Sequence, residues 1–194
     1  MQALHLLRIQ ARANRLANLR LHNAMAPLTR AELHAPRTSF FPTLMATLNH
    51  ILGVDQYYVG VLHREPGLFD AWHVFVDAQE LPDLTERQRT SDDRLIAWLE
   101  QANDAALDGA VHMPRAQGRI QTDAAAHLLQ HLFMHQMHHR GQVHAMLSGT
   151  AVAPPQLDEF MMPSEPHLRT AEMAQLGWLE SAVYGPVLQP PSQT

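Results

Sequence analysis

The chain has 194 residues, of which 46% are hydrophobic, and a formal net charge of −5, a composition typical of one folded domain. It contains no cysteine and all 14 basic residues are arginine, so disulfides, thiolate metal ligands and a Schiff-base lysine are excluded. No basic cluster or apolar run of membrane-spanning length stands out, which argues against nucleic-acid and membrane partners, and residues 1–8 lack a signal-peptide pattern, which predicts a cytoplasmic protein.

Four segments with apolar residues at helical spacing predict long helices. Their expected spans are about 4–25, 43–63, 91–109 and 122–149. Proline stands just before the second segment and soon after the first, where it favours a helix start and a helix end. Ser91 is the expected N-cap of the third helix, because a serine hydroxyl can accept a hydrogen bond from the first-turn amides.

Long connections between these helices favour an all-α four-helix bundle with long crossovers. Residues 1–194 are expected to form a single domain, with the bundle at about 4–150 and a C-terminal extension at about 155–194. The extension is expected to contain a fifth helix at about 167–182, which covers the bundle or a partner subunit. Between the second and third helices, residues 72–76 predict at most a short extended piece.

Histidine is unusually frequent, with 14 residues, and seven of them lie between His112 and His144. His135 and His139 are four residues apart, so a helix places both imidazoles on one face, with Cβ atoms about 6 Å apart. A helical wheel puts this pair at the apolar stripe of the fourth helix, whereas His138 lies off the stripe and His144 points away. Such a pair can hold one divalent metal ion if another helix supplies a third ligand.

His50 is the predicted third ligand, because it lies in the interior of the second helix and shares a face with Val54 and Tyr57. The residues alone leave open a hydrogen-bonded histidine cluster without a metal. An all-imidazole set suits Zn²⁺ or Ni²⁺ better than Mg²⁺ or Ca²⁺, which prefer oxygen ligands. Gln142 is a candidate hydrogen-bond partner of the pair, and Arg140 is expected to form an ion pair.

Other catalytic patterns are absent from the sequence. A zincin-type hydrolase would place glutamate directly after the first histidine of the pair, where this chain has Gln136. No Gly-x-Ser-x-Gly nucleophile motif is present. Asp55, Tyr57 and Tyr58 are possible acid or base groups, but each is expected to be structural. The sequence therefore offers candidate metal ligands and no catalytic side chain.

Two sequence blocks together carry a family resemblance. They are Thr-Leu-Asn-His-Ile-Leu at residues 47–52 and His-Gln-Met-His-His-Arg-Gly-Gln at residues 135–142. Further matching pieces lie at residues 14–18, 40–41 and 154–158. Over about residues 4–160 the chain resembles the DinB (DinB/YfiT-like) family. Met134 and Leu16 depart from residues that are frequent in that family, and neither stands at a ligand position.

The resemblance implies a four-helix bundle, often dimeric, that holds a divalent metal ion through three histidines, here His50, His135 and His139. Relatives include thiol-dependent S-transferases and isomerases. A metal-dependent transferase is therefore expected, with zinc or nickel, a low-molecular-weight thiol as a further cofactor, a small-molecule substrate and a homodimeric assembly. The alternatives are a metal-dependent hydrolase and a non-catalytic metal-binding or stress-response protein.

Overall fold

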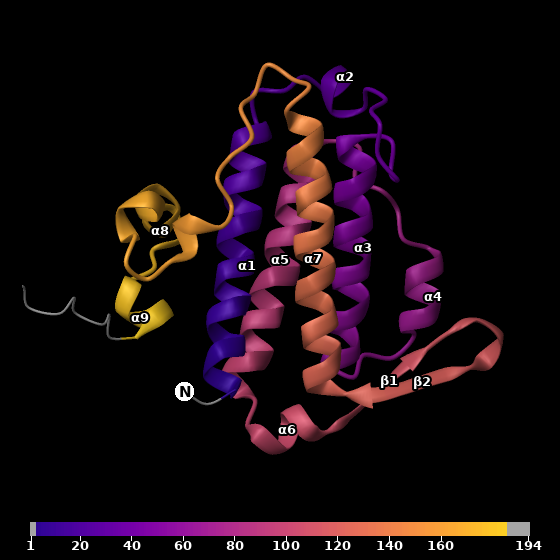
Figure 1. The fold of residues 1–194 in the computed structure, drawn as a ribbon. Coiled ribbons are helices and arrows are strands. Elements are labelled where there is room, and N and C mark those ends of the chain that lie inside the picture. Colours follow the sequence, from indigo (N-terminus) through magenta and orange to yellow (C-terminus); the bar gives the residue numbers. More distant parts are fainter. Residues whose placement is uncertain (1–2, 186–194) are drawn as a thin grey trace, which may run out of the picture.

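Four long helices run side by side in the computed structural model, which describes residues 3–185 (Figure 1). They are α1 (Ala3–Met25), α3 (Leu44–Leu62), α5 (Leu81–Gln101) and α7 (Ala125–Leu147). Helix α3 packs against both α5 and α7, while α1 packs mainly against α5. The predicted all-α bundle is therefore confirmed. Within the described residues, no helix has both the length and the hydropathy that a membrane crossing requires.

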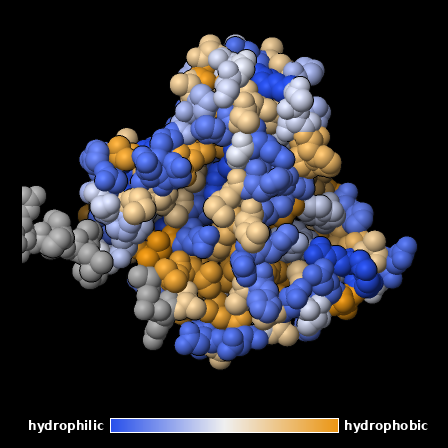
Figure 2. Space-filling view, viewed as in Figure 1, coloured by the Kyte–Doolittle hydropathy of each residue, from blue (hydrophilic) through white to orange (hydrophobic). Residues whose placement is uncertain are grey.

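Short elements connect the long helices or follow them. Those before α7 are α2 (Arg30–Leu33), α4 (Leu68–His73), α6 (Asp104–Asp108), β1 (Ala110–Pro114), η1 (Ala116–Gly118) and β2 (Ile120–Ala124). Those after α7 are η2 (Glu159–Met161), η3 (Pro166–Arg169), α8 (Thr170–Leu176) and α9 (Glu180–Tyr184). The two strands pair antiparallel and form a hairpin that projects away from the bundle (Figure 1). The surface around this hairpin is mainly hydrophilic (Figure 2).

Local sequence signals define the start of α3 and of α5. The side chain of Thr43 accepts a hydrogen bond of 3.0 Å from the backbone amide of Ala46 and so caps α3. Pro82 occupies the first turn of α5, where a missing backbone N–H removes no helical hydrogen bond. Helix α5 thus begins at Leu81, and the expectation of an N-cap at Ser91 was wrong. Ser91 is buried in the middle of the helix.

The hydrophobic core forms two clusters along the bundle, and a third cluster lies between α1 and the C-terminal extension. One cluster, near the hairpin, contains Leu99 and Leu129, and the other, near the opposite end, contains Met25 and Leu52. Between the two clusters lie buried polar side chains from all four long helices, which we call the polar core layer. Its members are Asn14, Asn18, Asp55, Gln88, Asp92, Gln136 and Arg140.

The polar core layer explains why the start of α5 was mispredicted. Gln88 and Asp92 face the interior at positions where an amphipathic helix ordinarily carries apolar residues. The apolar periodicity therefore becomes continuous only from Leu95 onward, although Leu81 and Leu84 are buried in the same helix. A search for apolar spacing finds the second half of α5 and misses the first.

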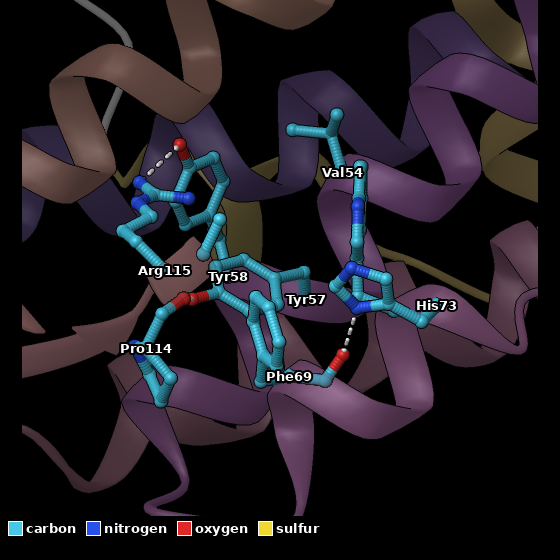
Figure 3. A pocket seen from close by; sticks show the side chains of 9 residues that line it. Val54, Tyr57, Tyr58, Phe69, His73, Pro114 and Arg115 are labelled. Atoms are coloured by element: carbon cyan, nitrogen blue, oxygen red, sulfur yellow. Dashed lines mark hydrogen bonds between the residues drawn. The ribbon is translucent and has the colours of Figure 1, made fainter. Parts of the chain in front are cut away.

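Two other expectations were also wrong. Helix α7 begins at Ala125, because the residues expected to start it, Thr122 and Asp123, pair with β1 as part of β2. Residues 72–76 are not extended throughout, since Trp72 and His73 form the end of α4. This short helix lies beside α3, and together with the hairpin it encloses a cavity of about 220 Å³ (Figure 3).

The residues after α7 fold against α1 (Figure 1). The guanidinium group of Arg20 lies 4.0 Å from the ring centre of Phe160 and pairs with Glu172 at 2.7 Å. Inside the extension, Arg169 is 0% exposed and pairs with Glu180 at 2.5 Å. The expectation of a single helix over residues 167–182 was wrong. The structure divides this segment among η3, α8 and α9, and Gly177, with a φ of 66°, ends α8.

Candidate metal centre

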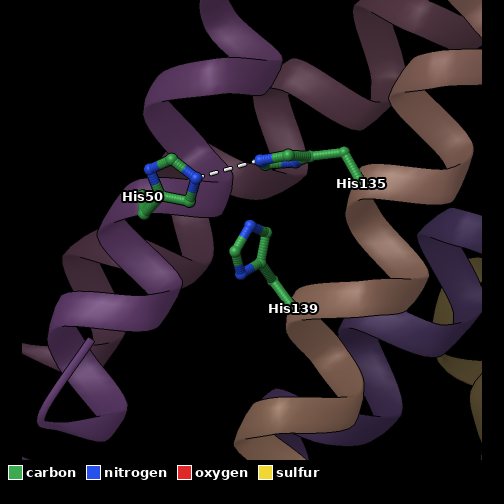
Figure 4. Close-up of side chains that lie close together, drawn as sticks. All are labelled: His50, His135 and His139. Carbon is green, nitrogen blue, oxygen red and sulfur yellow. Dashed lines mark hydrogen bonds between the residues drawn. The ribbon is translucent and has the colours of Figure 1, made fainter. Parts of the chain in front are cut away.

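Three imidazoles converge between α3 and α7. His50 projects from α3 toward His135 and His139, which lie one turn apart on α7 (Figure 4). One ring nitrogen of each histidine can be chosen so that the three atoms lie within 4.8 Å of one another. The Nε2 atoms of His50 and His135 are 3.0 Å apart. Because two nitrogens on one tetrahedral ion are about 3.3 Å apart, these rings need little movement to share a metal ion.

Neighbouring side chains orient two of the three rings. The ring of Phe41 stacks on His50, with centroids 4.3 Å apart and an interplanar angle of 29°. Nδ1 of His139 donates a hydrogen bond of 2.8 Å to the side-chain oxygen of Gln142. This bond fixes the tautomer that leaves the lone pair of Nε2 available to a metal. The expected role of Gln142 as a hydrogen-bond partner of the pair is confirmed.

Burial keeps the three imidazoles neutral at physiological pH. It lowers the pKa of His50 to about 4 and the pKa of His135 to about 3, and the neighbouring histidines add to both shifts. Burial also lowers the pKa of His139. Neutral imidazole is the form that binds metal ions. The chemistry of this donor set therefore fits a divalent transition metal ion.

Among the residues that the structure describes, no other side chain completes a fourth coordination position. Within residues 3–185, the three histidines are the one group of three or more histidine or carboxylate side chains close enough to share an ion. His131 is exposed, and its ring centre lies 6.1 Å from that of His135. His138 is exposed as well, as the helical wheel predicts. A site with three protein ligands leaves room for water or a substrate.

The three acid or base candidates occupy different environments. Asp55 belongs to the polar core layer, where it accepts hydrogen bonds from Gln136 and, over 2.7 Å, from Gln88. Burial raises the pKa of Asp55 well above its usual value. The hydroxyl group of Tyr57 donates a hydrogen bond of 2.5 Å to a backbone carbonyl. Tyr58 lines the cavity beside α4. Asp55 and Tyr57 thus serve the fold, as expected.

Arg140 does not form the ion pair expected from the sequence. Its Nη1 atom donates hydrogen bonds to the side-chain oxygens of Asn14 (2.5 Å), Asn18 (3.0 Å) and Gln136 (2.8 Å). Burial lowers the pKa of Arg140 to about 10. Gln136 and Arg140 follow the two α7 histidines directly in sequence and so lie about 100° around the helix from them. Their hydrogen bonds join this neighbouring face of α7 to α1 and α3.

A cavity of about 330 Å³ borders His50 on the side of α4. His50 and Phe41 form part of its wall, and Trp72 and Asp77 contribute from the connection between α3 and α5. The sequence analysis assigned no role to Trp72 or Asp77. Their position depends on how α4 docks against α3, and no spacing pattern in the sequence signals that contact.

A family comparison agrees with this geometry. The chain matches the family model described as DinB family over residues 2–171. The chain belongs to the DinB family. The resemblance carried by the two sequence blocks is therefore confirmed, and the matched region contains all three histidines, α4 and the hairpin. No curated protein matches the chain.

Proposed function

We propose that this DinB protein binds one divalent transition metal ion through His50, His135 and His139 and acts as a metal-dependent enzyme. The observation that carries the proposal is the convergence of three neutral imidazoles from two helices beside a cavity. Zinc and nickel are the favoured ions, because both accept nitrogen ligands in sets of this kind. When bound, such an ion acts as a Lewis acid that lowers the pKa of a coordinated water or thiol.

The reaction that we favour is transfer of a small thiol to an electrophilic substrate. The chain contains no cysteine, so the thiol must come from a separate cofactor. Gln136 stands where a zincin hydrolase carries its general base, and its amide is occupied in the polar core layer. The family resemblance supports this choice, since thiol-dependent S-transferases are among the relatives that it implies, and the chain belongs to that family.

A metal-dependent hydrolase is the second candidate. It is favoured by Asp77, whose carboxylate group lines the cavity next to His50 and could accept a proton from water. The two reactions are separable, because only transfer requires a thiol. The homodimer implied by the family resemblance is also a proposal, and light scattering of the purified protein would test it.

Elemental analysis of purified variants tests the metal site. His50→Ala and His139→Ala should each lose stoichiometric metal. His138→Ala and His144→Ala serve as matched controls on α7 and should retain it, since neither histidine belongs to the converging group. Full metal content in both ligand variants would refute the assignment, as would loss of metal from all four variants.

Kinetics on the zinc-loaded and nickel-loaded protein distinguish the reactions. Consumption of an electrophile that requires an added low-molecular-weight thiol and stops after chelation supports transfer. Turnover without thiol, with a rate that rises with pH, supports hydrolysis. Stoichiometric metal with no turnover across broad panels of thiols, electrophiles and esters would contradict an enzymatic role.

A further inference from the structure

We infer that the cavity between α3, α4 and the hairpin binds a small aromatic carboxylate, whose anionic end is held by Arg115. This inference rests on the proposed function, because it names the class of substrate that would reach the three-histidine site. We call this space the Arg115 cavity. Val54, Tyr57 and Tyr58 line it from α3, Phe69 and Trp72 from α4, and Arg115 from the hairpin loop (Figure 3).

The walls of the Arg115 cavity favour a flat, apolar molecule. The rings of Tyr57 and Trp72 meet edge to face, with centroids 5.7 Å apart, and Tyr58 meets Tyr57 in the same way at 5.4 Å. The cavity volume is about 220 Å³. An engineered apolar cavity of about 150 Å³ accommodates benzene, so this space suits one ring with a short substituent.

The guanidinium group of Arg115 gives the Arg115 cavity a positive charge. The Arg115 guanidinium lies over the rings of Tyr57 and Tyr58 at 5.4 and 5.8 Å, and its Nη2 atom donates a hydrogen bond of 3.3 Å to the Tyr58 hydroxyl group. Among residues 3–185, no carboxylate lies within ion-pair distance of Arg115. A guanidinium in this position can bind a carboxylate with two parallel hydrogen bonds.

The Arg115 cavity adjoins the cavity that borders His50. Val54 follows His50 by one turn on α3, which corresponds to about 6 Å along the helix axis, and Tyr58 follows by about 12 Å. Trp72 lines both the Arg115 cavity and the cavity beside His50. A ligand whose carboxylate rests on Arg115 therefore extends its other end along α3 toward the three histidines.

Calorimetric titration with phenylacetate and with phenylacetamide tests the inference. The two probes have nearly the same shape, and only phenylacetate carries a charge. Phenylacetate should bind at least about tenfold more tightly than the amide, to the metal-free and to the zinc-loaded protein, because the guanidinium pairs with the carboxylate. Equal affinities for the two probes, or no binding of phenylacetate at millimolar concentration, would overturn the proposal.

Variants of the hairpin locate the binding group. Arg115→Gln should weaken phenylacetate binding by at least about tenfold, and Arg115→Lys should keep part of the preference for the acid. Arg119→Gln is the matched control, because it removes the same charge from the same hairpin without lining the cavity. Equal losses in Arg115→Gln and Arg119→Gln, with thermal melting unchanged, would mean that only general electrostatics acts.

Metal content separates this inference from the proposed function. Arg115→Gln should keep stoichiometric zinc, whereas His50→Ala should lose zinc and still bind phenylacetate. Binding that requires zinc and ignores Arg115→Gln would show that the probe coordinates the metal, and the inference would fail while the metal site stands. If His50→Ala kept both its zinc and its binding of phenylacetate, the inference about the Arg115 cavity would stand and the metal site would be refuted.

Discussion

Nδ1 of His139 and the side-chain oxygen of Gln142 are 2.8 Å apart, one turn along α7. This hydrogen bond predicts that Gln142→Leu weakens zinc binding by about 10- to 100-fold although all three ligands remain, because the ring loses its fixed tautomer and orientation. Gln142→Glu should restore the affinity. Competition with a chromophoric chelator measures it. Gln130→Leu, at an exposed glutamine of the same helix, is the control and should bind zinc like the wild type.

Zinc affinity should be nearly independent of pH between about pH 8 and about pH 6. In the metal-free protein the pKa of His50 is lowered to about 4 and that of His135 to about 3, so neither ring binds a proton in this range. Proton competition at His50 and His135 should begin only as the pH falls toward 4. Chelator competition at several pH values checks this. A tenfold loss of affinity between pH 7 and pH 6 would indicate imidazoles with ordinary pKa values and contradict the prediction.

A fall in pH should destabilise the protein because the folded state holds His22 in its neutral form. Burial, assisted by the charges of Arg15 and Arg140, lowers the pKa of His22 from 6.5 to about 3. The unfolded chain therefore takes up a proton first, and stability falls by up to about 1.4 kcal/mol per pH unit as the pH drops below 6.5. Between about pH 7 and about pH 4.5, the wild type should therefore lose about 2–3 kcal/mol more unfolding free energy than His22→Leu does.

Asp92 should change the stability of the fold with pH in the opposite direction from His22. Burial raises the pKa of this carboxyl group from 3.8 to about 6, so its ionised form destabilises the fold at neutral pH and protonation relieves that effect as the pH falls. Between about pH 7 and about pH 4.5, the unfolding free energy of Asp92→Asn should fall by about 2 kcal/mol relative to that of the wild type. Guanidinium titrations of the metal-free proteins at both pH values measure the two shifts. Stability curves parallel to the wild type in both variants would contradict both assignments.

The buried cation of the C-terminal extension should dominate the stability of that region. Arg169 pairs with Glu180 and donates hydrogen bonds to the carbonyl oxygens of Phe160 and Met162. Arg169→Met leaves these acceptors without a donor, and we expect a loss of about 3 kcal/mol. Arg89→Met breaks only the exposed pairs with Glu86 and Asp93 and should change stability by at most about 1 kcal/mol. Chemical denaturation measures both, and similar losses would contradict the role of Arg169.

The helices that carry the metal centre could be predicted because their apolar residues keep helical spacing. On α7 this spacing sets the phase of six histidines, and the structure keeps His139 inside and His138 outside as the helical wheel predicts. His50 could be found because it shares a face with buried Val54 and Tyr57 on α3. Two helices and their phases were thus sufficient to bring three imidazoles together.

The surroundings of the centre could not be predicted in the same way. The first half of α5 was missed because Gln88 and Asp92 occupy interior positions and form hydrogen bonds there, which a pattern of apolar residues cannot indicate. Trp72 and Arg115 belong to elements too short to show a period, and tertiary contacts place them beside α3. The sequence therefore predicted the three converging histidines, whereas the residues around the cavities required the fold.

The hairpin leaves the bundle between α6 and α7 and packs against α3 without supplying any of the converging histidines. Projecting segments of this kind tolerate insertion and replacement far better than packed helices do. Exchange of the hairpin that bears Arg115 would therefore change the lining of the Arg115 cavity and leave the three converging histidines in place. If the two proposals hold, the residues that select the substrate and those that bind the metal ion lie in separate parts of the chain and can change independently in evolution.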